Sequence, residues 1–420
     1  MISLIAGWTS DMWLPVINLF SFIPNYAWMI LVFTVVLKIV LSPLDFWQRK
    51  VSRDSMKKQA RLQPEMQKIQ KKYANDKQQL NQKTMELYKR ENYNVVGSCL
   101  SMIVNMGLTL FIFITLFTGL SEIAQQKIYT QYTELQDSYY ASYNADFVSD
   151  YSIDTTGLND EEIQTAINTK LQDLINAEKP QAEADLINEH ADNLEYIPTQ
   201  DEIDARAKAM VLGSTTMTTI TTTAQEAVLV KYDQIKDSWL WVKNIWRPDT
   251  SVASFPDYDT FVNISNVKTQ SFYTNVVNST TLSADEINAI KAQWQDEYKT
   301  VTAKILTENT GWNGYYILVI LAALITYFSA DFSQKQSLKK KKDEAVDENP
   351  TASATKLMKW FLPVIMVIFT LSYSGAFAIY IVINSLMSFI FSIIALEVFS
   401  RQDEKKEKLN KINNKVDYSR

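Results

Sequence analysis

Residues 28–44 read WMILVFTVVLKIVLSPL, an apolar stretch long enough to cross a bilayer, and its only charged residue is Lys38. A lysine at membrane depth costs about 2.5–3.5 kcal/mol on insertion scales. Such a residue normally faces a wet cavity or an anionic partner, or it serves a function. The stretch therefore predicts a membrane-spanning helix with a polar site inside it.

Four further apolar stretches predict membrane helices, and the last two come from one apolar run, 357–399. A single helix over that run would be about 65 Å long, roughly twice the thickness of a bilayer core of about 30 Å. The run must therefore fold back, and Ser372 to Gly375 supply the small, turn-competent residues. The five predicted spans are 26–44, 96–120, 312–330, 357–371 and 376–398.

The charges of the connecting segments predict the topology. Residues 45–96 hold 13 Lys and Arg against 6 Asp and Glu, whereas residues 122–312 hold 13 against 30. The segment 334–359 and the tail after Phe399 are rich in lysine. The positive-inside rule places the basic segments in the cytoplasm and leaves the acidic region outside. Five spans then give an outside N-terminus and a cytoplasmic C-terminus.

These observations predict an all-α polytopic membrane protein of nine consecutive parts. They are an interfacial amphipathic helix (1–25), the first span (26–44), a cytoplasmic helical hairpin (45–95), the second span (96–120), an extracytoplasmic inserted domain (121–311), the third span (312–331), a cytoplasmic loop (332–356), the fourth and fifth spans (357–399), and a basic cytoplasmic tail (400–420). The first part could instead be the ragged start of the first span. The hairpin, with its turn at Ala74 to Asp76, either only fixes the topology or forms a docking surface for a partner or for anionic lipid.

The acidic region shows three helix starts, at Asn159, Thr199 and Ser283, and the last two match the capping box in residue type and spacing. The helix from Ser283 is expected to run to about Leu306. The Thr-rich stretch 213–223 predicts either β-structure or a disordered linker. The stretch 239–246, WLWVKNIW, resembles an amphipathic helix lying on the outer leaflet.

Known catalytic patterns do not occur in the chain. It carries no phosphate-binding loop and no G-x-S-x-G or H-E-x-x-H motif. Its single cysteine, Cys99, and single histidine, His190, argue against a disulfide framework and a His-based metal site. We therefore expect no enzyme activity, no cofactor and no DNA binding.

Lys38 remains the principal candidate for function. The acids on the other spans, Asp331 and Glu397, fall at the cytoplasmic ends. We therefore expect Lys38 to lack a carboxylate partner. It would either snorkel to the cytoplasmic headgroups or be solvated in a cavity open to the cytoplasm. The cavity hypothesis depends on this lone, hydrated ammonium group, and a carboxylate that already neutralises it would contradict that hypothesis.

Several motifs occur in an order typical of one family. L-x-P-L follows Lys38, Q-P-E-M-Q-K-I-Q-K-K-Y starts at Gln63, and N-x-x-G-x-C, from Asn94 to Cys99, lies at the start of the second span. M-K-W-F-L-P-V-I-M-V-I-F-T-L-S-Y-S-G and I-Y-I-V-I-N-S-L come later. This order resembles the YidC family of membrane protein insertases, relatives of the Oxa and Alb proteins, over about 26–120 and 312–399. The matching residues are Gln63, Pro64, Asp76, Lys77, Leu87, Tyr88, Asn94, Gly97, Cys99, Met358, Lys359, Pro363, Ser374, Gly375, Tyr380 and Asn384.

The resemblance implies a five-helix insertase core in a bacterial cell membrane, with a polar groove that receives clients. The family's groove arginine falls on Lys38, and the other implied groove residues are Ser329, Tyr380 and Asn384. The implied docking residues of the hairpin are Gln63, Pro64, Lys77 and Tyr88. The implied partners are nascent membrane protein clients and the lipid bilayer, with the Sec translocon, the ribosome and the signal recognition particle receptor as further candidates.

Three departures from the family pattern concern the groove and the acidic region. Lys38 keeps the charge of arginine without its planar fork. Ser329 stands where members often carry Gln, and about 190 residues replace a short loop between the second and third spans. An alternative function is a membrane anchor that presents the acidic region to a partner. A small-solute transporter is disfavoured, because the spans lack paired ionisable residues and an evident inverted repeat.

Overall fold

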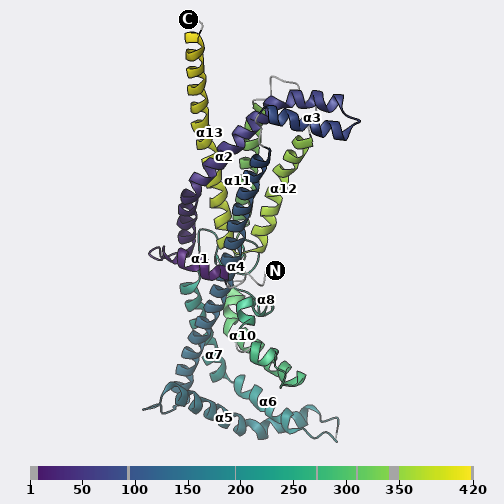
Figure 1. Cartoon of the computed structure of the whole chain (residues 1–420). Helices are drawn as coiled ribbons and strands as arrows, with labels where there is room; N and C mark the ends of the chain where they lie inside the picture. Colours follow the sequence, from purple (N-terminus) through teal and green to yellow (C-terminus); the bar gives the residue numbers. More distant parts are fainter. Residues whose placement is uncertain are drawn as a thin grey trace. The chain divides into compact units, whose positions relative to one another are not determined.

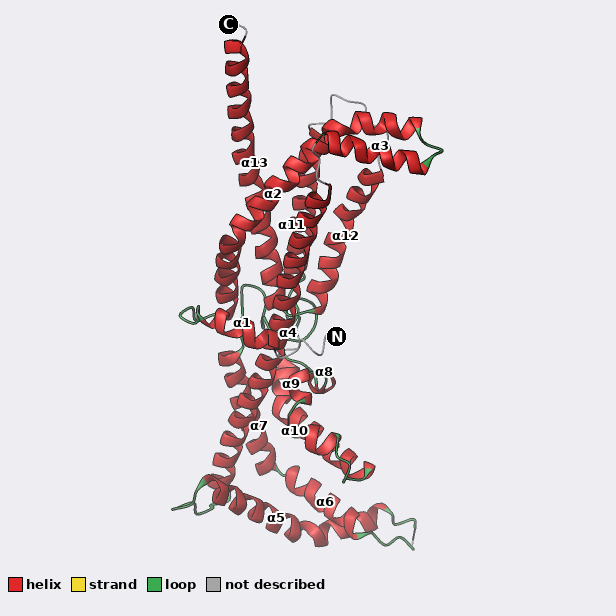
Figure 2. Cartoon of the chain, viewed as in Figure 1, coloured by secondary structure: helices red, strands yellow, loops and turns green. Residues whose placement is uncertain are grey.

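The computed structural model describes residues 8–91, 95–193, 195–270, 273–308, 311–339 and 350–417. Within these ranges the chain is built from helices and contains no β-strand (Figure 2). Isolated antiparallel bridges join Trp239 to Val242 and Ala253 to Trp312. The all-α prediction is confirmed.

Most of the helices are labelled in Figure 1, where the numbers follow the chain order. Their bounds are α1 (Trp8–Asn18), α2 (Tyr26–Lys72), α3 (Lys77–Arg90), α4 (Val95–Asp150), α5 (Asp160–Glu189), α6 (Gln200–Leu212), α7 (Thr215–Ile235), α8 (Tyr258–Val262), α9 (Ser265–Lys268), the π-helix η2 (Tyr273–Val277), α10 (Ala284–Glu308), α11 (Ile317–Lys339), α12 (Pro350–Ser372) and α13 (Gly375–Asp417).

The chain divides into two compact units. Unit 1 comprises Met1–Ala124, Asp237–Val252 and Asn313–Arg420, and unit 2 comprises Gln125–Lys236 and Ala253–Trp312. The long helix α4 contributes its first part to unit 1 and the remainder to unit 2.

In unit 1, α13 packs against α2 and α11, and α11 also packs against α12. Helix α12 ends at Ser372 and α13 begins at Gly375, so the chain turns where the small residues predicted a turn. An aromatic cluster joins α4, α12 and α13: the Phe117 ring lies 5.3 Å from Phe369, 4.3 Å from Tyr373 and 5.1 Å from Phe377 between centroids. These edge-to-face contacts hold the turn between α12 and α13 against α4.

Helix α2 runs without a break through the predicted first span and the first arm of the hairpin. Both Pro43 and Pro64 lie inside it, so Pro64 does not end the helix. The turn to α3 follows Tyr73, and the Asp76 carboxylate caps α3 by accepting from the N–H groups of Gln78 and Gln79, each at 3.0 Å. The end of α2 and α3 pack against each other and form a helical hairpin.

Residues 237–252, here called the capping segment, form turns rather than the amphipathic helix predicted over 239–246. Trp239 and Val242 exchange backbone hydrogen bonds of 2.9 Å across a tight turn. Val242, Ile245 and Trp246 are nearly fully buried. The helix prediction was wrong because spacing alone could not show that this backbone bonds to the ends of other helices.

The capping segment binds the beginnings of three helices. The Asn25 side chain, which caps α2, donates to the carbonyl of Ser238 at 2.9 Å. At the start of α13, the N–H groups of Gly375 and Ala376 donate to the carbonyls of Arg247 and Ile245, both at 2.8 Å. The contacts of Gly375 and Ala376 satisfy N–H groups that a helix cannot satisfy internally, and the contact of Asn25 holds the capping residue of α2.

Asp249 caps the start of α11. Its carboxylate accepts from the N–H of Tyr315 at 2.9 Å and from the N–H of Leu318 at 2.7 Å. A Cβ atom at Gly314 would lie 1.7 Å from an Asp249 oxygen, so only glycine fits beside the carboxylate. Because α2, α11 and α13 all begin at one segment, they run in the same direction. The predicted topology also gives these three spans one direction.

Unit 2 is a helical fold whose starts are capped as the sequence predicted. Asn159 and Thr199 form full capping boxes with Glu162 and Glu202. Ser283 exchanges hydrogen bonds with Glu286, and α10 continues to Glu308. One hydrophobic cluster among the described residues of the unit has the following buried members: Phe147, Ile167, Ile175, Ala182, Ile203, Ala207, Val211, Met217 and Ile220.

The Thr-rich stretch is helical, which contradicts both structures predicted for it. It forms the first turns of α7, where Met217, Ile220 and Ala224 are fully buried at helical spacing. The exposed threonines bond within the helix: Thr219 Oγ1 donates to the carbonyl of Thr215 at 2.8 Å. Threonine is less favourable in a helix than alanine by up to about 0.7 kcal/mol per residue. Burial of the apolar face outweighs this cost.

A polar site between two apolar helices

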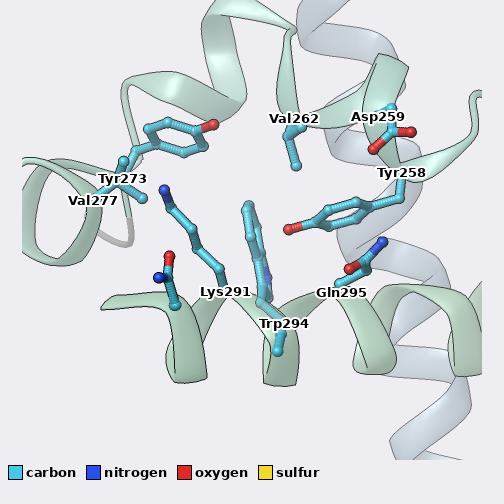
Figure 3. Close-up of a pocket in the computed structure, with 10 residues that line it drawn as sticks. Tyr258, Asp259, Val262, Tyr273, Val277, Lys291, Trp294 and Gln295 are labelled. Carbon is cyan, nitrogen blue, oxygen red and sulfur yellow. The ribbon is translucent and has the colours of Figure 1, made fainter. Parts of the chain in front are cut away.

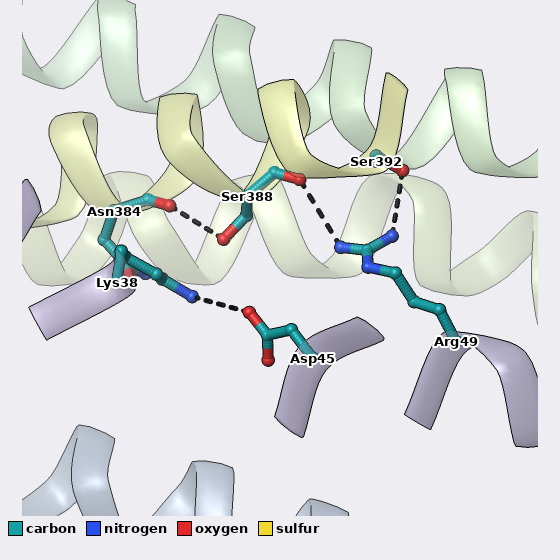
Figure 4. A network of polar contacts seen from close by, with 6 residues as sticks. All are labelled: Lys38, Asp45, Arg49, Asn384, Ser388 and Ser392. Atoms are coloured by element: carbon teal, nitrogen blue, oxygen red, sulfur yellow. Dashed lines mark hydrogen bonds and ion pairs between the residues drawn. The ribbon is translucent and has the colours of Figure 1, made fainter. Parts of the chain in front are cut away.

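Lys38 has a carboxylate partner, so the expectation of an unpaired lysine is wrong. Its Nζ lies 3.7 Å from Oδ2 of Asp45, two turns further along α2 (Figure 4). The two side chains are 16% and 24% exposed. Opposite charges about 4 Å apart attract by about 4 kcal/mol at an effective dielectric constant of about 20. Asp45 therefore offsets much of the cost of placing Lys38 in an apolar helix.

Arg49 is the second cation of the site, and sequence analysis did not single it out. Its Nη1 donates to Ser392 Oγ at 2.9 Å and its Nη2 to the carbonyl of Ser388 at 3.4 Å. Both acceptors lie on α13, so the guanidinium group ties α2 to α13 through neutral groups. At 100° per residue, Lys38, Asp45 and Arg49 fall on one face of α2. That spacing was the signal in the sequence that could have revealed the group.

The predicted groove residue Asn384 lies on the same helix, one turn before Ser388. The Ser388 hydroxyl donates to its carbonyl at 2.8 Å (Figure 4). The structure thus brings α2, with Lys38, and the polar stretch of α13, with Asn384, into one interhelical contact. Further along, the Phe46 and Phe391 rings meet at 6.2 Å between centroids.

Two other predicted groove residues lie elsewhere in unit 1. Tyr380 is buried, with its ring 6.1 Å from that of Phe377. It belongs to the end of the aromatic cluster at the start of α13. Ser329 is half-buried on α11 and has interactions of its own. The described contacts of Lys38 include neither residue.

The predicted hairpin residues take different places. Lys77 is exposed at the start of α3, and Pro64 is exposed on α2. The Tyr88 hydroxyl donates to the Met66 sulfur at 3.3 Å and so joins the two arms. Gln63 lies in α2, but its side chain is outside the described set.

Unit 2 contains a hollow of about 350 Å³ that sequence analysis did not anticipate (Figure 3). Tyr258, Tyr273 and Trp294 line it together with Lys291 and Asp259. Both tyrosine rings meet Trp294 edge-on, at 6.2 and 6.4 Å between centroids. Burial raises the pKa of Tyr258 above its ordinary value. Tyr273 begins the π-helix η2, and such turns recur at functional sites.

Metal chemistry gains no support from the part of the chain that the structure describes. Within it, no three His, Cys, Asp or Glu residues gather in a group that could hold a metal ion. The polar site between α2 and α13 has a carboxylate, two cations and hydroxyl groups, but no nucleophile paired with a base. Such an arrangement can attract, orient and hydrate a charged segment.

Comparison with known proteins identifies the family. A family model described as "60Kd inner membrane protein" matches residues 18–247, more than half of the chain. The chain belongs to this family. The matched range contains the helices from α2 to α7 and most of the capping segment.

Curated relatives named "Membrane protein insertase YidC" align with shorter parts of the chain. The relative from Leptospira interrogans serovar Lai is 45% identical over 100 residues, which is 24% of this chain and 15% of that protein. The relative from Fusobacterium nucleatum is 42% identical over 100 residues, 24% of this chain and 47% of that protein. The relative from Oleidesulfovibrio alaskensis is 35% identical over 118 residues, 27% of this chain and 20% of that protein. The alignments thus span less than half of each of these relatives. No solved structure matches the chain.

Family membership makes the chain a cell-membrane protein, and the helices agree with this. Among the described residues, two helical stretches are long and apolar enough to span a membrane, Tyr26–Val51 and Gly375–Gln402. Shorter apolar helices cover Ile317–Ser329 and Pro363–Ser372. The two long stretches carry the polar site.

Proposed function

We propose that the protein is a membrane protein insertase that inserts client helices and assists their folding, and that the polar contact between α2 and α13 lies in its client groove. The observation that carries the proposal is the group of Lys38, Asp45 and Arg49 on the face of α2 that meets α13. The relatives named membrane protein insertase supply the function class. No covalent chemistry is required.

The proposed mechanism follows from charge and solvation. Two cations and one carboxylate leave the site with a net positive charge, which keeps it hydrated and attracts the polar or acidic tail of a client. The client's apolar helix of about 20 residues then moves into lipid, and burial of its apolar surface supplies the driving force. The groove lowers the barrier for the polar tail.

In the proposed topology five spans cross the membrane, with the N-terminus outside and the C-terminus in the cytoplasm. α1 lies in the membrane interface. The hairpin and the basic tail then face the cytoplasm, where nascent clients, the ribosome and the signal recognition particle receptor would meet them. The Sec translocon is a further candidate partner. Unit 2 lies outside. The parallel arrangement of α2, α11 and α13 supports the relative direction of three of these spans.

The test is to deplete the protein from cells, express each variant in its place at the same protein level, and follow insertion of a single-span client. Lys38→Ala should slow insertion at least about tenfold, the effect of ~1.4 kcal/mol. Lys38→Arg should restore most of the rate, because the charge is kept. Lys50→Ala removes an exposed cation from another face of α2 and serves as the matched control. Normal insertion with Lys38→Ala would contradict the groove proposal.

A second candidate is a membrane anchor that presents unit 2 to a partner, and the aromatic hollow in unit 2 favours it. The two candidates differ in what unit 2 contributes. We would replace 125–236 and 253–312 by short linkers and keep the capping segment, because three helices begin on it. An insertase should keep part of its activity, whereas an anchor should lose its function completely.

A further inference from the structure

Asp45 is the only acid within the long apolar stretch Tyr26–Val51. It lies between Lys38 and Arg49 on one face of α2, and it acts electrostatically on both. Lys50, the remaining cation of the stretch, points about 120° away from this face. One carboxylate therefore interacts electrostatically with two cations.

The two cations are held in different ways. Arg49 is fixed by two hydrogen bonds to neutral groups on α13, Ser392 Oγ at 2.9 Å and the Ser388 carbonyl at 3.4 Å. For Lys38, the interaction that the structure describes is the one with Asp45, at 3.7 Å. That separation gives electrostatic attraction without the length of a hydrogen bond. Lys38 is therefore held by one ion partner on its own helix, whereas Arg49 is anchored to a second helix by two hydrogen bonds.

Resting on the proposed insertase function, we propose that Asp45 is an exchangeable counter-ion that determines which clients the site accepts. It neutralises Lys38 while the site is empty and yields to a carboxylate from the client's polar tail. Once displaced, Asp45 stays on the same face of α2 as Arg49, one turn away and within its electrostatic influence, so neither carboxylate is left without a cation. No bond is made or broken, and only ion partners change.

The exchange determines the substrate class. A tail with Asp or Glu can replace Asp45 at Lys38, whereas a neutral tail cannot. A basic tail meets the net positive charge of the site and is repelled. Asp45 thus competes with acidic tails, and its charge reduces the preference for them.

The experiment uses the full chain in liposomes and two single-span clients that differ only in two aspartates or two asparagines in the translocated tail. The readout is the ratio of the initial insertion rates, acidic over neutral, because a ratio cancels differences in folding and amount. Asp45→Asn should raise this ratio about tenfold, equivalent to ~1.4 kcal/mol of removed competition. Asp45→Glu should keep the wild-type ratio.

Two further variants separate this inference from simpler explanations. Asp54→Asn removes the same charge from α2, but Asp54 is exposed and lies about 180° around the helix from Asp45. It should leave the ratio unchanged. In a Lys38→Met background, Asp45→Asn should no longer raise the ratio, because the competition requires the ammonium group.

The outcomes distinguish the two proposals. An unchanged or lower ratio with Asp45→Asn, while the wild-type chain inserts both clients, overturns the counter-ion role and leaves the insertase function standing. A rise that persists in the Lys38→Met background also overturns it. If the wild-type chain inserts neither client, the proposed function itself fails.

Discussion

The two units of the molecule place polar and apolar side chains in opposite ways. In unit 1 the helices expose large apolar residues, among them Val40 at 68% and Trp360 at 63%, while Lys38 and Asp45 pair within the helical layer. In unit 2 Phe261 and Tyr298 are almost fully buried, and ion pairs such as Lys304 with Glu226 lie on the surface. Unit 1 has the pattern of a protein in lipid and unit 2 that of a protein in water.

The difference shows what stabilises each unit. Apolar burial stabilises unit 2, at about 25 cal/mol for each Å² removed from water. The hydrophobic effect contributes little between helices surrounded by lipid, so unit 1 depends more on packing and on satisfied polar groups. The capping segment and the contacts of Arg49 are such groups. Substitutions of matching kinds in the two units should therefore have different effects.

The largest expected effect is in the aromatic core of unit 2. Tyr298 packs against Tyr132 and Phe261, with centroids 4.9 and 4.7 Å away, and its hydroxyl donates to the Pro256 carbonyl at 2.7 Å. Tyr298→Ala should destabilise unit 2 by about 3–5 kcal/mol through the cavity it leaves. Tyr298→Phe should cost about 1–3 kcal/mol, because the carbonyl loses its donor.

Hydrogen exchange of the full chain in detergent measures this loss at the amides of α7 and α10. Peptides from α2 serve as the internal reference. If the free energy of opening measured in α10 stays within about 1 kcal/mol of wild type after Tyr298→Ala, the core is not stabilised by aromatic burial.

The next effect is in the capping segment of unit 1. Asp249→Ala leaves the buried N–H of Leu318 and the part-buried N–H of Tyr315 without their acceptor. The expected cost is about 1–3 kcal/mol, seen as faster amide exchange in the first turn of α11. Ser251→Ala, which removes an exposed hydrogen bond with Tyr316, is the matched control in the same segment. Equal exchange in both variants would show that the capping bonds do not stabilise α11.

A smaller effect is expected at alkaline pH in unit 2. Burial raises the pKa of Tyr143 to about 12, and the nearby Tyr139 and Tyr151 add to the shift. The folded state thus holds this proton more tightly than the unfolded chain, whose tyrosines titrate near pH 10. The stabilisation is complete below pH 10 and is lost as the pH rises through about 12.

Amide exchange of the described part of α4 beyond residue 124, followed from pH 9 to 12, measures this loss. Tyr143→Phe should weaken the pH dependence within the window from 10 to 12 and change little below it. An identical pH profile in the variant would show that Tyr143 does not contribute to it.

Sequence patterns predicted the structural features that depend on residues close together in the chain. The caps at Asn159, Thr199 and Ser283 and the turn before Gly375 follow from residues close together in the chain. The capping segment did not follow, because its residues bond to helices more than 60 residues away; the Asp249 carboxylate, for example, accepts from the N–H of Leu318 in α11. The Thr-rich part of α7 was missed because threonine content received more weight than the buried positions at helical spacing.

The pair of Lys38 and Asp45 was missed for a related reason. The first span was expected to end at Leu44, so Asp45 was counted with the cytoplasmic hairpin. The structure continues α2 through both, and a helix of that length places Asp45 two turns from Lys38 on the same face. A helical projection carried across the expected end of the span would have revealed the pair and Arg49.

The central claim is that a client's polar tail passes along the face where α2 meets α13. A photo-crosslinking side chain at position 384, on the helix face that carries Ser388, tests it most directly during insertion of a single-span client. Position 386 is the control, because Leu386 is exposed and two residues turn the helix by about 200°. We expect the client's tail to crosslink from position 384 and not from 386. Efficient insertion with tail crosslinks from 386 and none from 384 would contradict the claim.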